Sequence, residues 1–204
     1  MDRACSARHC LLGSRLSRMR RGVFTALIVL VCVCSANNET EDGTTEYRVK
    51  RAFVINFLKF VEWPETSTNE TDQPFVIAVF GKIPLPEGSS NIRDVKFNQR
   101  NVVMTIQHEW NSNSQSQKKL LEQCGVLFIT KSEEKSTPEL LAAVKQRSVL
   151  TVGETADFLE KGGIINFEVV DNKVRFSVHL KHAKEANLEI RSKLLRLAKE
   201  VDED

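Results

Sequence analysis

The spacing of apolar residues predicts a helix near the start of the folded part of the chain. Apolar residues recur at steps of three and four positions between Tyr47 and Val61, and charged residues fill many of the positions between them. This spacing is typical of a helix that buries one face. Trp63-Pro64 ends the pattern, because proline disfavours helical geometry in the residue before it. We therefore expect a helix that begins near Tyr47 and ends before Pro64.

Four short runs rich in apolar residues further along the chain predict strands. They occupy residues 75–80, 102–106, 126–129 and 149–152. The run at 75–80 is continuous and apolar, which is typical of a strand that is covered on both faces. Between the last two runs, the segment Thr137-Pro138-Glu139 predicts the start of a helix. A capping hydroxyl, a proline at the first position and an acid in the first turn all stabilise a helix N-terminus.

Two β-rich runs, 164–170 and 173–180, predict an antiparallel hairpin. An Asp-Asn dipeptide joins them, and such a pair suits a tight two-residue turn. In the second run, apolar residues alternate with Arg175, Ser177 and His179. Because successive side chains of a strand point to opposite faces, this alternation predicts one polar face on the hairpin.

Apolar residues at helical spacing predict a final helix over 188–201. Strands that alternate with helices and then end in a hairpin indicate an α/β fold. We expect a mostly parallel sheet between helix layers, a three-layer sandwich, with a C-terminal antiparallel hairpin and a final helix.

An apolar run at residues 23–34 stands apart from these elements. Six arginines and one acid precede it, and a small-residue site ending at Ala36 follows it. A basic region, an apolar stretch of about 7–15 residues and a small-x-small site describe a secretory signal peptide. We therefore expect cleavage after about Ala36, with an uncleaved membrane anchor as the alternative. Met19 begins a more compact leader, so translation from Met1 or from Met19 would give the same exported product.

This leader sets the domain organisation and the charge. We expect residues 1–36 to be removed, the polar residues 37–46 to form a flexible lead-in, and residues 47–204 to form one domain. The leader holds six of the 29 basic residues and one of the 27 acidic residues, which leaves 23 basic and 26 acidic residues and a net charge of −3. A mildly acidic domain without a stripe of Lys and Arg lacks the electrostatic footprint of a nucleic-acid-binding protein.

The leader also holds four of the five cysteines, so Cys124 is alone in the exported part. An oxidising compartment permits disulfides, but a single cysteine has no internal partner. An intermolecular bond through Cys124 is the remaining disulfide option. Burial in a core must therefore hold the domain together, and a length of roughly 160 residues is sufficient for that.

The sequence contains no motif that announces catalysis. It lacks a phosphate-binding loop, a dinucleotide fingerprint and the Gly-x-Ser-x-Gly elbow of hydrolases. Cys124 would need a nearby base to act as a nucleophile, and a small buried thiol is the simpler interpretation. His179 and His182 lie three residues apart, but no cluster of cysteines or acids completes a metal-ligand set. We therefore predict a protein that is not an enzyme and has neither a cofactor nor a metal site.

Two surfaces are better suited to contact with a partner. One is the corner at Trp63, for which ordinary core packing is the alternative. The other is the polar face of the predicted hairpin, where Arg175 and His179 lie in line with Glu168. An arginine among polar neighbours on a rigid strand can anchor a partner or an anion, and a merely solvated sheet face is the alternative. The candidate partner-binding residues are thus Trp63, Glu168, Arg175 and His179.

Several blocks occur in series along the chain. They are RAFVINFLKFVEWPE at 51–65, FVIAVFGK at 75–82, VLFITKSE at 126–133, VLTVGETADFLEKGGIINFEVVDNKVRFSVHL at 149–180 and LEIRSKLLRLAKEV at 188–201. Together these blocks resemble the YfiR family of periplasmic signalling regulators, over nearly the whole exported domain.

The resemblance implies a regulator that acts by binding. The best understood member of the family is a soluble periplasmic repressor of an inner-membrane diguanylate cyclase, which keeps cyclic-di-GMP synthesis low. An outer-membrane-associated lipoprotein can titrate that repressor away, and similar domains occur fused to sensor kinases. For this chain the resemblance implies an α/β sandwich, a possible homodimer and repression of a membrane-bound signalling enzyme by direct contact. It supplies no catalytic residue.

The chain departs from the family in its cysteines. Family members commonly form intradomain disulfides, whereas only Cys124 stands here where a family cysteine would, so control through an internal disulfide is not expected. Residues 83–123 match least well and are the place for a changed specificity. The rival interpretation is a small-ligand sensor that holds a metabolite in the crevice at the carboxyl ends of the strands.

Overall fold

The computed structural model describes residues 38–64, 73–84, 92 and 95–204. The predicted signal peptide and its cleavage site lie outside the described residues. One compact unit runs from Gly43 to Asp204, and side chains are described within it. Of the preceding unit, Met1–Asp42, only the backbone from residue 38 is described, where it forms the start of a helix.

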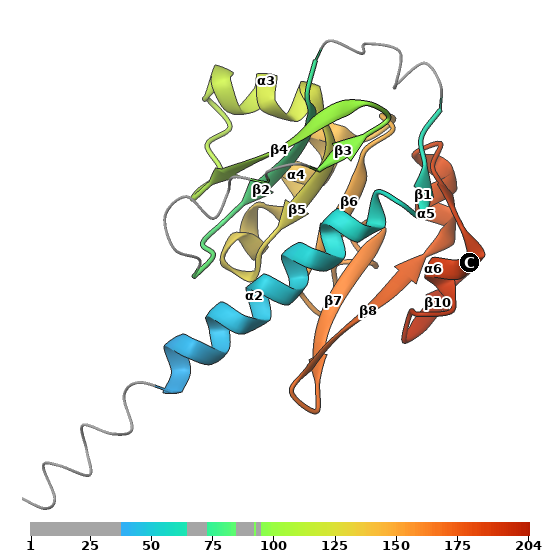
Figure 1. Cartoon of the computed structure of the whole chain (residues 1–204). Coiled ribbons are helices and arrows are strands. Elements are labelled where there is room, and N and C mark those ends of the chain that lie inside the picture. The colour runs from blue at the N-terminus through green and yellow to red at the C-terminus, as the bar shows by residue number, and fades with distance from the viewer. Residues whose placement is uncertain (1–37, 65–72, 85–91, 93–94) are drawn as a thin grey trace, which may run out of the picture. The chain divides into compact units, whose positions relative to one another are not determined.

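An eight-stranded, mostly parallel sheet forms the centre of the compact unit (Figure 1). Its strands lie in the order β10-β8-β7-β6-β5-β2-β4-β3. The five mutually parallel strands are β2 (Phe75–Phe80), β4 (Arg100–Gln107), β5 (Cys124–Ile129), β6 (Leu150–Gly153) and β7 (Ile165–Val170). The outer strands are β3 (Lys96–Phe97), antiparallel to β4, β8 (Lys173–His179), antiparallel to β7, and β10 (Glu200–Asp202), parallel to β8.

Helices cover both faces of this sheet. α2 (Asn38–Phe57) buries Val54 and Phe57 on one face, in the same core cluster as Ile77 and Val79 of β2. On the other face, a second cluster joins Phe80 of β2 to the buried apolar residues of α3 (Gln115–Gln123) and α4 (Thr137–Val144). Because neighbouring residues of β2 point to opposite faces, a continuous apolar run suits a strand between two helix layers. The predicted α/β class with its C-terminal hairpin is confirmed.

Shorter elements complete the unit. They are the 3-10 helix η2 (Lys131–Ser136), the helices α5 (Leu180–Glu185) and α6 (Ser192–Leu195), and an antiparallel pair of strands, β1 (Val61–Glu62) and β9 (Glu189–Ile190). No helix in the described part of the chain has both the length and the apolar character that crossing a membrane requires.

The C-terminal segment differs from the prediction of one helix over 188–201. It forms β9, the four-residue helix α6 and then β10. Its backbone donors find distant partners: Arg191 N donates to Phe60 O at 2.9 Å, and Lys199 N donates to Phe176 O at 2.8 Å. These bonds tie the segment to the turn that follows α2 and to β8, and they replace the hydrogen bonds that a continuous helix would make.

The helix predicted from Tyr47 also has different bounds. α2 begins earlier, at Asn38, and ends at Phe57. Lys59 N and Phe60 N then close tight turns onto Asn56 O and Phe57 O, and the chain enters β1 before it reaches Pro64. The helix therefore ends several residues before the proline that was expected to stop it.

Candidate partner-binding surface

The β7–β8 hairpin places two of the predicted residues opposite each other. Its register pairs Glu168 with Arg175 and Asn166 with Ser177. Directly opposed residues of an antiparallel pair share one face. Asp171 and Asn172 form the turn, with φ angles of 50° and 56°. Positive φ at both central residues is the geometry of a two-residue turn that matches the twist of the strands.

The outer half of this hairpin, residues 168–175, extends beyond the neighbouring strands, and we call it the hairpin arm. β6 pairs only with Ile165 and Asn166 at the start of β7, and β10 pairs only with the end of β8, from Ser177 onwards. The arm therefore has no strand on either side within the described structure, and it projects from the sheet (Figure 1).

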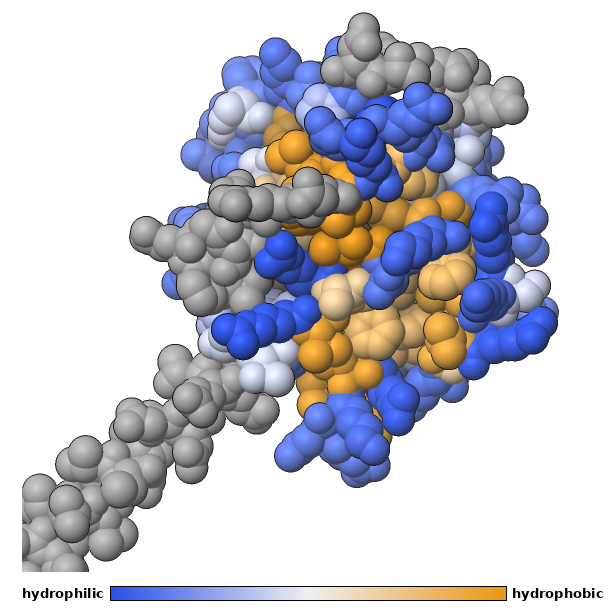
Figure 2. All heavy atoms as spheres, in the orientation of Figure 1, coloured by the Kyte–Doolittle hydropathy of each residue, from blue (hydrophilic) through white to orange (hydrophobic). Residues whose placement is uncertain are grey.

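The arm exposes both apolar and charged side chains. Val169 is 51% exposed and Val170 is 37% exposed. Apolar side chains gather along the hairpin behind a hydrophilic tip (Figure 2). Arg175 is exposed and makes no hydrogen bond or ion pair to any residue that the structure describes. The arm thus offers apolar surface and one available guanidinium, which is the composition of a contact surface rather than of a packed element.

Glu168 lies beside Arg175 but is already engaged. Its carboxylate accepts hydrogen bonds from the Lys199 ammonium at 2.6 Å and from the Ser177 hydroxyl at 2.9 Å. The bond from Lys199 is the main cause that lowers the pKa of the Glu168 carboxyl, and the bond from Ser177 adds to it. Glu168 therefore anchors Lys199 next to the arm, and its charge is compensated.

His179 lies at the inner end of β8, and this part of the predicted polar face is not an open surface. Ser177 and His179 are both buried, because β10 pairs with this half of β8. The His179 ring stacks on His182 of α5, with centroids 3.6 Å apart, and its Nε2 lies 3.6 Å from Asp202 Oδ2. Burial, and then His182, lower the pKa of His179. The side chain is therefore covered by this chain's own elements.

Trp63 lies at the amino end of β2, whereas the arm lies at the carboxyl end of β7. Its ring packs edge-to-face on Phe75, the first residue of β2, and on Phe97, at centroid distances of 5.5 and 5.1 Å. The indole is half-buried, and its Nε1 has no hydrogen-bond partner among the described residues. The structure therefore brings Glu168 and Arg175 together but does not bring Trp63 to them.

Cys124 begins β5 and is buried. Its Sγ donates a hydrogen bond to Leu121 O at 3.3 Å, and burial raises the pKa of the thiol to about 12. A protonated, covered thiol is a poor nucleophile. The structure therefore disfavours the predicted option of an intermolecular disulfide through this residue.

A buried polar cluster, which the sequence analysis missed, joins α2 to the carboxyl end of β6. The Glu154 side chain is 3% exposed and pairs with the Lys50 ammonium. It also accepts hydrogen bonds from the Tyr47 hydroxyl and, at 2.6 Å, from the Lys131 backbone N–H. Burial, and then Glu154, raise the pKa of Tyr47. The sequence does contain one signal for this carboxylate, because Gly153-Glu154 follows directly after the apolar run 149–152.

This cluster occupies part of the edge where the rival interpretation placed a ligand crevice. Glu154 and Glu46 both pair with the Lys50 ammonium, so the three side chains form one ion-pair cluster within the chain. The arrangement fastens α2 to the sheet. Among the residues that the structure describes, no group of three or more His, Cys, Asp and Glu side chains could hold a metal ion.

A three-layer α/β domain with a projecting hairpin is the class of protein that these observations define. The chain belongs to the YfiR/HmsC-like family, whose sequence model matches residues 47–199. This family is one of periplasmic proteins that regulate signalling. The resemblance inferred from the sequence blocks is therefore confirmed. A search of curated protein sequences finds no match to this chain.

Proposed function

We propose that this protein represses a membrane-bound signalling enzyme, a diguanylate cyclase, by direct contact through the hairpin arm. Membership in a family of periplasmic signalling regulators supports the regulatory role. The observation that carries the contact surface is the arm itself, which has two exposed valines and an available Arg175 and no neighbouring strand in the described structure.

The arm has the chemistry of a protein-binding element. Burying Val169 and Val170 against a partner would contribute roughly 25 cal/mol for each Å² of apolar surface removed from water. The free edges of the arm can accept a further strand, since an extended segment pairs readily with unpaired backbone groups. Around the valines, Lys173 and Arg175 outweigh Asp171. We therefore expect the partner surface to be apolar with an acidic rim.

The first test is a crosslinked pull-down of the tagged protein from its own host. Wild-type protein should recover an inner-membrane protein that has a periplasmic domain and a cyclic-nucleotide or kinase output domain. Arg175→Glu should lower this recovery roughly tenfold or more, because it places a like charge against the acidic rim. The matched control is Lys119→Glu, which reverses an exposed charge on α3, in a different layer.

Two results would contradict the proposal. Full recovery by a folded Arg175→Glu variant would remove the arm from the contact surface while leaving the repressor role intact. Recovery of no membrane protein by the wild type would remove the repressor role itself. Circular dichroism and a melting curve show whether each variant is folded.

Other partners follow from the family alone. An outer-membrane-associated lipoprotein that titrates the repressor, a sensor kinase in place of the cyclase, and a homodimer stay predictions. The same pull-down distinguishes them by the identity of the protein recovered.

A small-ligand sensor is the second candidate function. The observation that favours it is a groove of about 590 Å³ between α4 and α5, a volume within the usual range for small-molecule sites. The groove lies at the amino ends of β6 and β7, where Val149 and Ile164 precede these strands. It is therefore not at the carboxyl edge, where a crevice was expected.

A further inference from the structure

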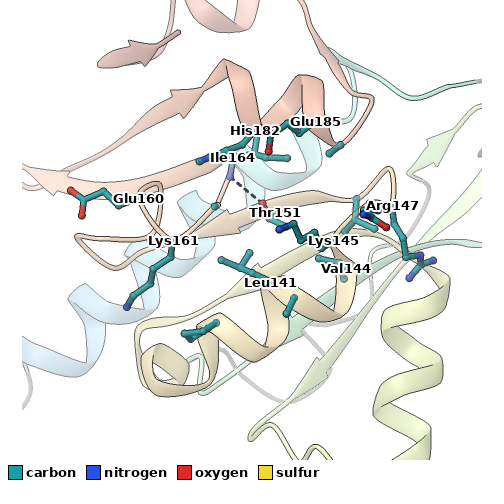
Figure 3. Close-up of a pocket in the computed structure, with 16 residues that line it drawn as sticks. Leu141, Val144, Lys145, Arg147, Thr151, Glu160, Lys161, Ile164, His182 and Glu185 are labelled. Carbon is teal, nitrogen blue, oxygen red and sulfur yellow. Dashed lines mark hydrogen bonds between the residues drawn. The ribbon is translucent and has the colours of Figure 1, made fainter. Parts of the chain in front are cut away.

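The groove between α4 and α5 has an aliphatic lining. Leu141 and Val144 of α4 form one wall, and Ile164 lies across from them at the start of β7 (Figure 3). Val149 lines the groove at the start of β6. All four of these side chains are buried in the core at less than one-tenth exposure. Pro138, Ala142 and Ala186 add further aliphatic surface. The aromatic ring in the lining is the imidazole of His182, which is already stacked on His179.

One polar group lies deep in this groove with a free donor. Thr151 of β6 is buried, and its hydroxyl oxygen accepts the Ile164 backbone N–H at 3.0 Å (Figure 3). A hydroxyl that accepts one hydrogen bond still has its own proton to donate. The structure gives that proton no acceptor in the described part of the chain, so it is available to a ligand.

One cation reaches over the same space. Lys145 caps the C-terminus of α4, and its side chain extends across the groove in the direction of Thr151 (Figure 3). Its ammonium has no hydrogen bond or ion pair to the residues that the structure describes. A free ammonium and a free hydroxyl above an aliphatic floor suit the two oxygens of a carboxylate.

The other charges that line the groove are engaged or displaced. Arg147 donates to the carbonyl oxygens of Leu121 and Glu122, and Lys161 pairs with Asp157 at 2.6 Å. Glu160 points away from the groove, and Glu185 lies beside His182 on the α5 side (Figure 3). An anionic head would therefore lie at the Lys145 end, away from both carboxylates.

We infer that this groove binds a medium-chain aliphatic carboxylate. The carboxylate accepts hydrogen bonds from Lys145 Nζ and Thr151 Oγ, and the alkyl chain lies on the aliphatic residues of α4 and of the strand starts. This site is separate from the hairpin arm, because the groove lies at the amino end of β7 and the arm at its carboxyl end. Ligand binding here does not depend on the proposed contact with a cyclase.

Calorimetric titration with octanoate tests this site, with octan-1-ol and octylamine as probes of equal chain length. Octanoate should bind and raise the melting temperature, by linkage, whereas the alcohol and the amine should bind at least tenfold more weakly. Lys145→Met keeps the length of the side chain but removes the ammonium, and it should weaken octanoate binding roughly tenfold or more. Lys119→Met on α3 is the matched control and should leave binding unchanged.

A second variant separates loss of the site from loss of the fold. Ala142 is exposed on α4 and lines the groove, so Ala142→Trp should fill the space and abolish binding while the protein stays folded. Equal binding of octanoate and octan-1-ol would overturn the inference, since the head group would then not be recognised. Unchanged octanoate binding by Lys145→Met, or no octanoate binding by the wild type, would also overturn it.

Discussion

Cys124 illustrates how burial determines the chemistry of a single residue. Outside the predicted leader it is the lone cysteine of the sequence, and a lone thiol in an exported protein invites the prediction of an intermolecular bond. In the structure the thiol faces the core cluster of α3 and α4, and its only hydrogen bond in the described part is to Leu121 O. The burial of this thiol, rather than the lack of a second cysteine, decides its reactivity.

We therefore predict that native Cys124 reacts slowly with thiol reagents. Burial raises the pKa of this thiol to about 12, so the reactive thiolate is scarce at neutral pH. At pH 8 the rate with Ellman's reagent should be at least roughly a hundredfold lower for native protein than for protein in guanidinium chloride. Rapid labelling of the native protein, or a disulfide-linked dimer on a non-reducing gel, would contradict this.

The residues of the candidate site show which contacts a sequence can reveal. Glu168 and Arg175 were predictable as neighbours, because a two-residue turn fixes the register of the hairpin. The burial of His179 was not predictable, because it depends on β10, a strand that returns from further along the chain. The link between Glu154 and Lys50 spans 104 positions, and nothing in the local pattern pairs the two charges.

At the scale of elements, the strands were predictable and the last helix was not. The apolar runs that became β2, β5 and β6 are covered on both faces, so local composition carried the signal. In the segment 188–201 the spacing of Leu194, Leu195 and Ala198 fits a helix, and a short one forms at α6. The remaining residues of this segment form strands, because β9 pairs with β1 and β10 pairs with β8. Such long-range pairing overrides local periodicity.

The attachment of α2 to the sheet gives a second prediction. Lys50→Met removes one partner of a buried ion pair and leaves the Glu154 carboxylate without its cation. Removing one member of a buried pair costs about 3–5 kcal/mol, so the free energy of unfolding in urea should fall by about that amount. The matched control, Arg48→Met, lies on the exposed face of the same helix and should change stability little.

A double variant separates the charge from the packing. In Lys50→Met combined with Glu154→Gln, the neutral amide still accepts hydrogen bonds from Tyr47 and Lys131 but carries no buried charge. The double variant should therefore be more stable than Lys50→Met alone. Equal losses in Lys50→Met and Arg48→Met would show that the pair does not hold α2 in place.

At the scale of the whole molecule, the C-terminal strand β10 links His179, α5 and the base of the hairpin arm. β10 closes the sheet over His179, α5 supplies the stacked His182, and Lys199 joins the strand to Glu168 at the base of the arm. Lys181 and Glu185 of α5 and Asp202 of β10 also act on the charge of His179. The protonation state of His179 therefore affects the packing of α5 and β10, which lie beside the proposed contact surface.

This coupling predicts that the protein loses stability on mild acidification. Burial, and then His182, hold the pKa of folded His179 below its ordinary value of about 6.5, which the unfolded chain recovers. The unfolded state thus binds more protons, so the free energy of unfolding falls as the pH drops from about 7 through the folded pKa. Urea unfolding at pH 7.5, 6.5 and 5.5 measures the effect.

The variant His179→Phe tests whether His179 is the titrating group. It keeps a ring on His182 but cannot titrate, so it should flatten the dependence of stability on pH. His108→Gln on the surface is the control and should not flatten it. A wild type with constant stability, or a His179→Phe variant with the full dependence, would place the titrating group elsewhere.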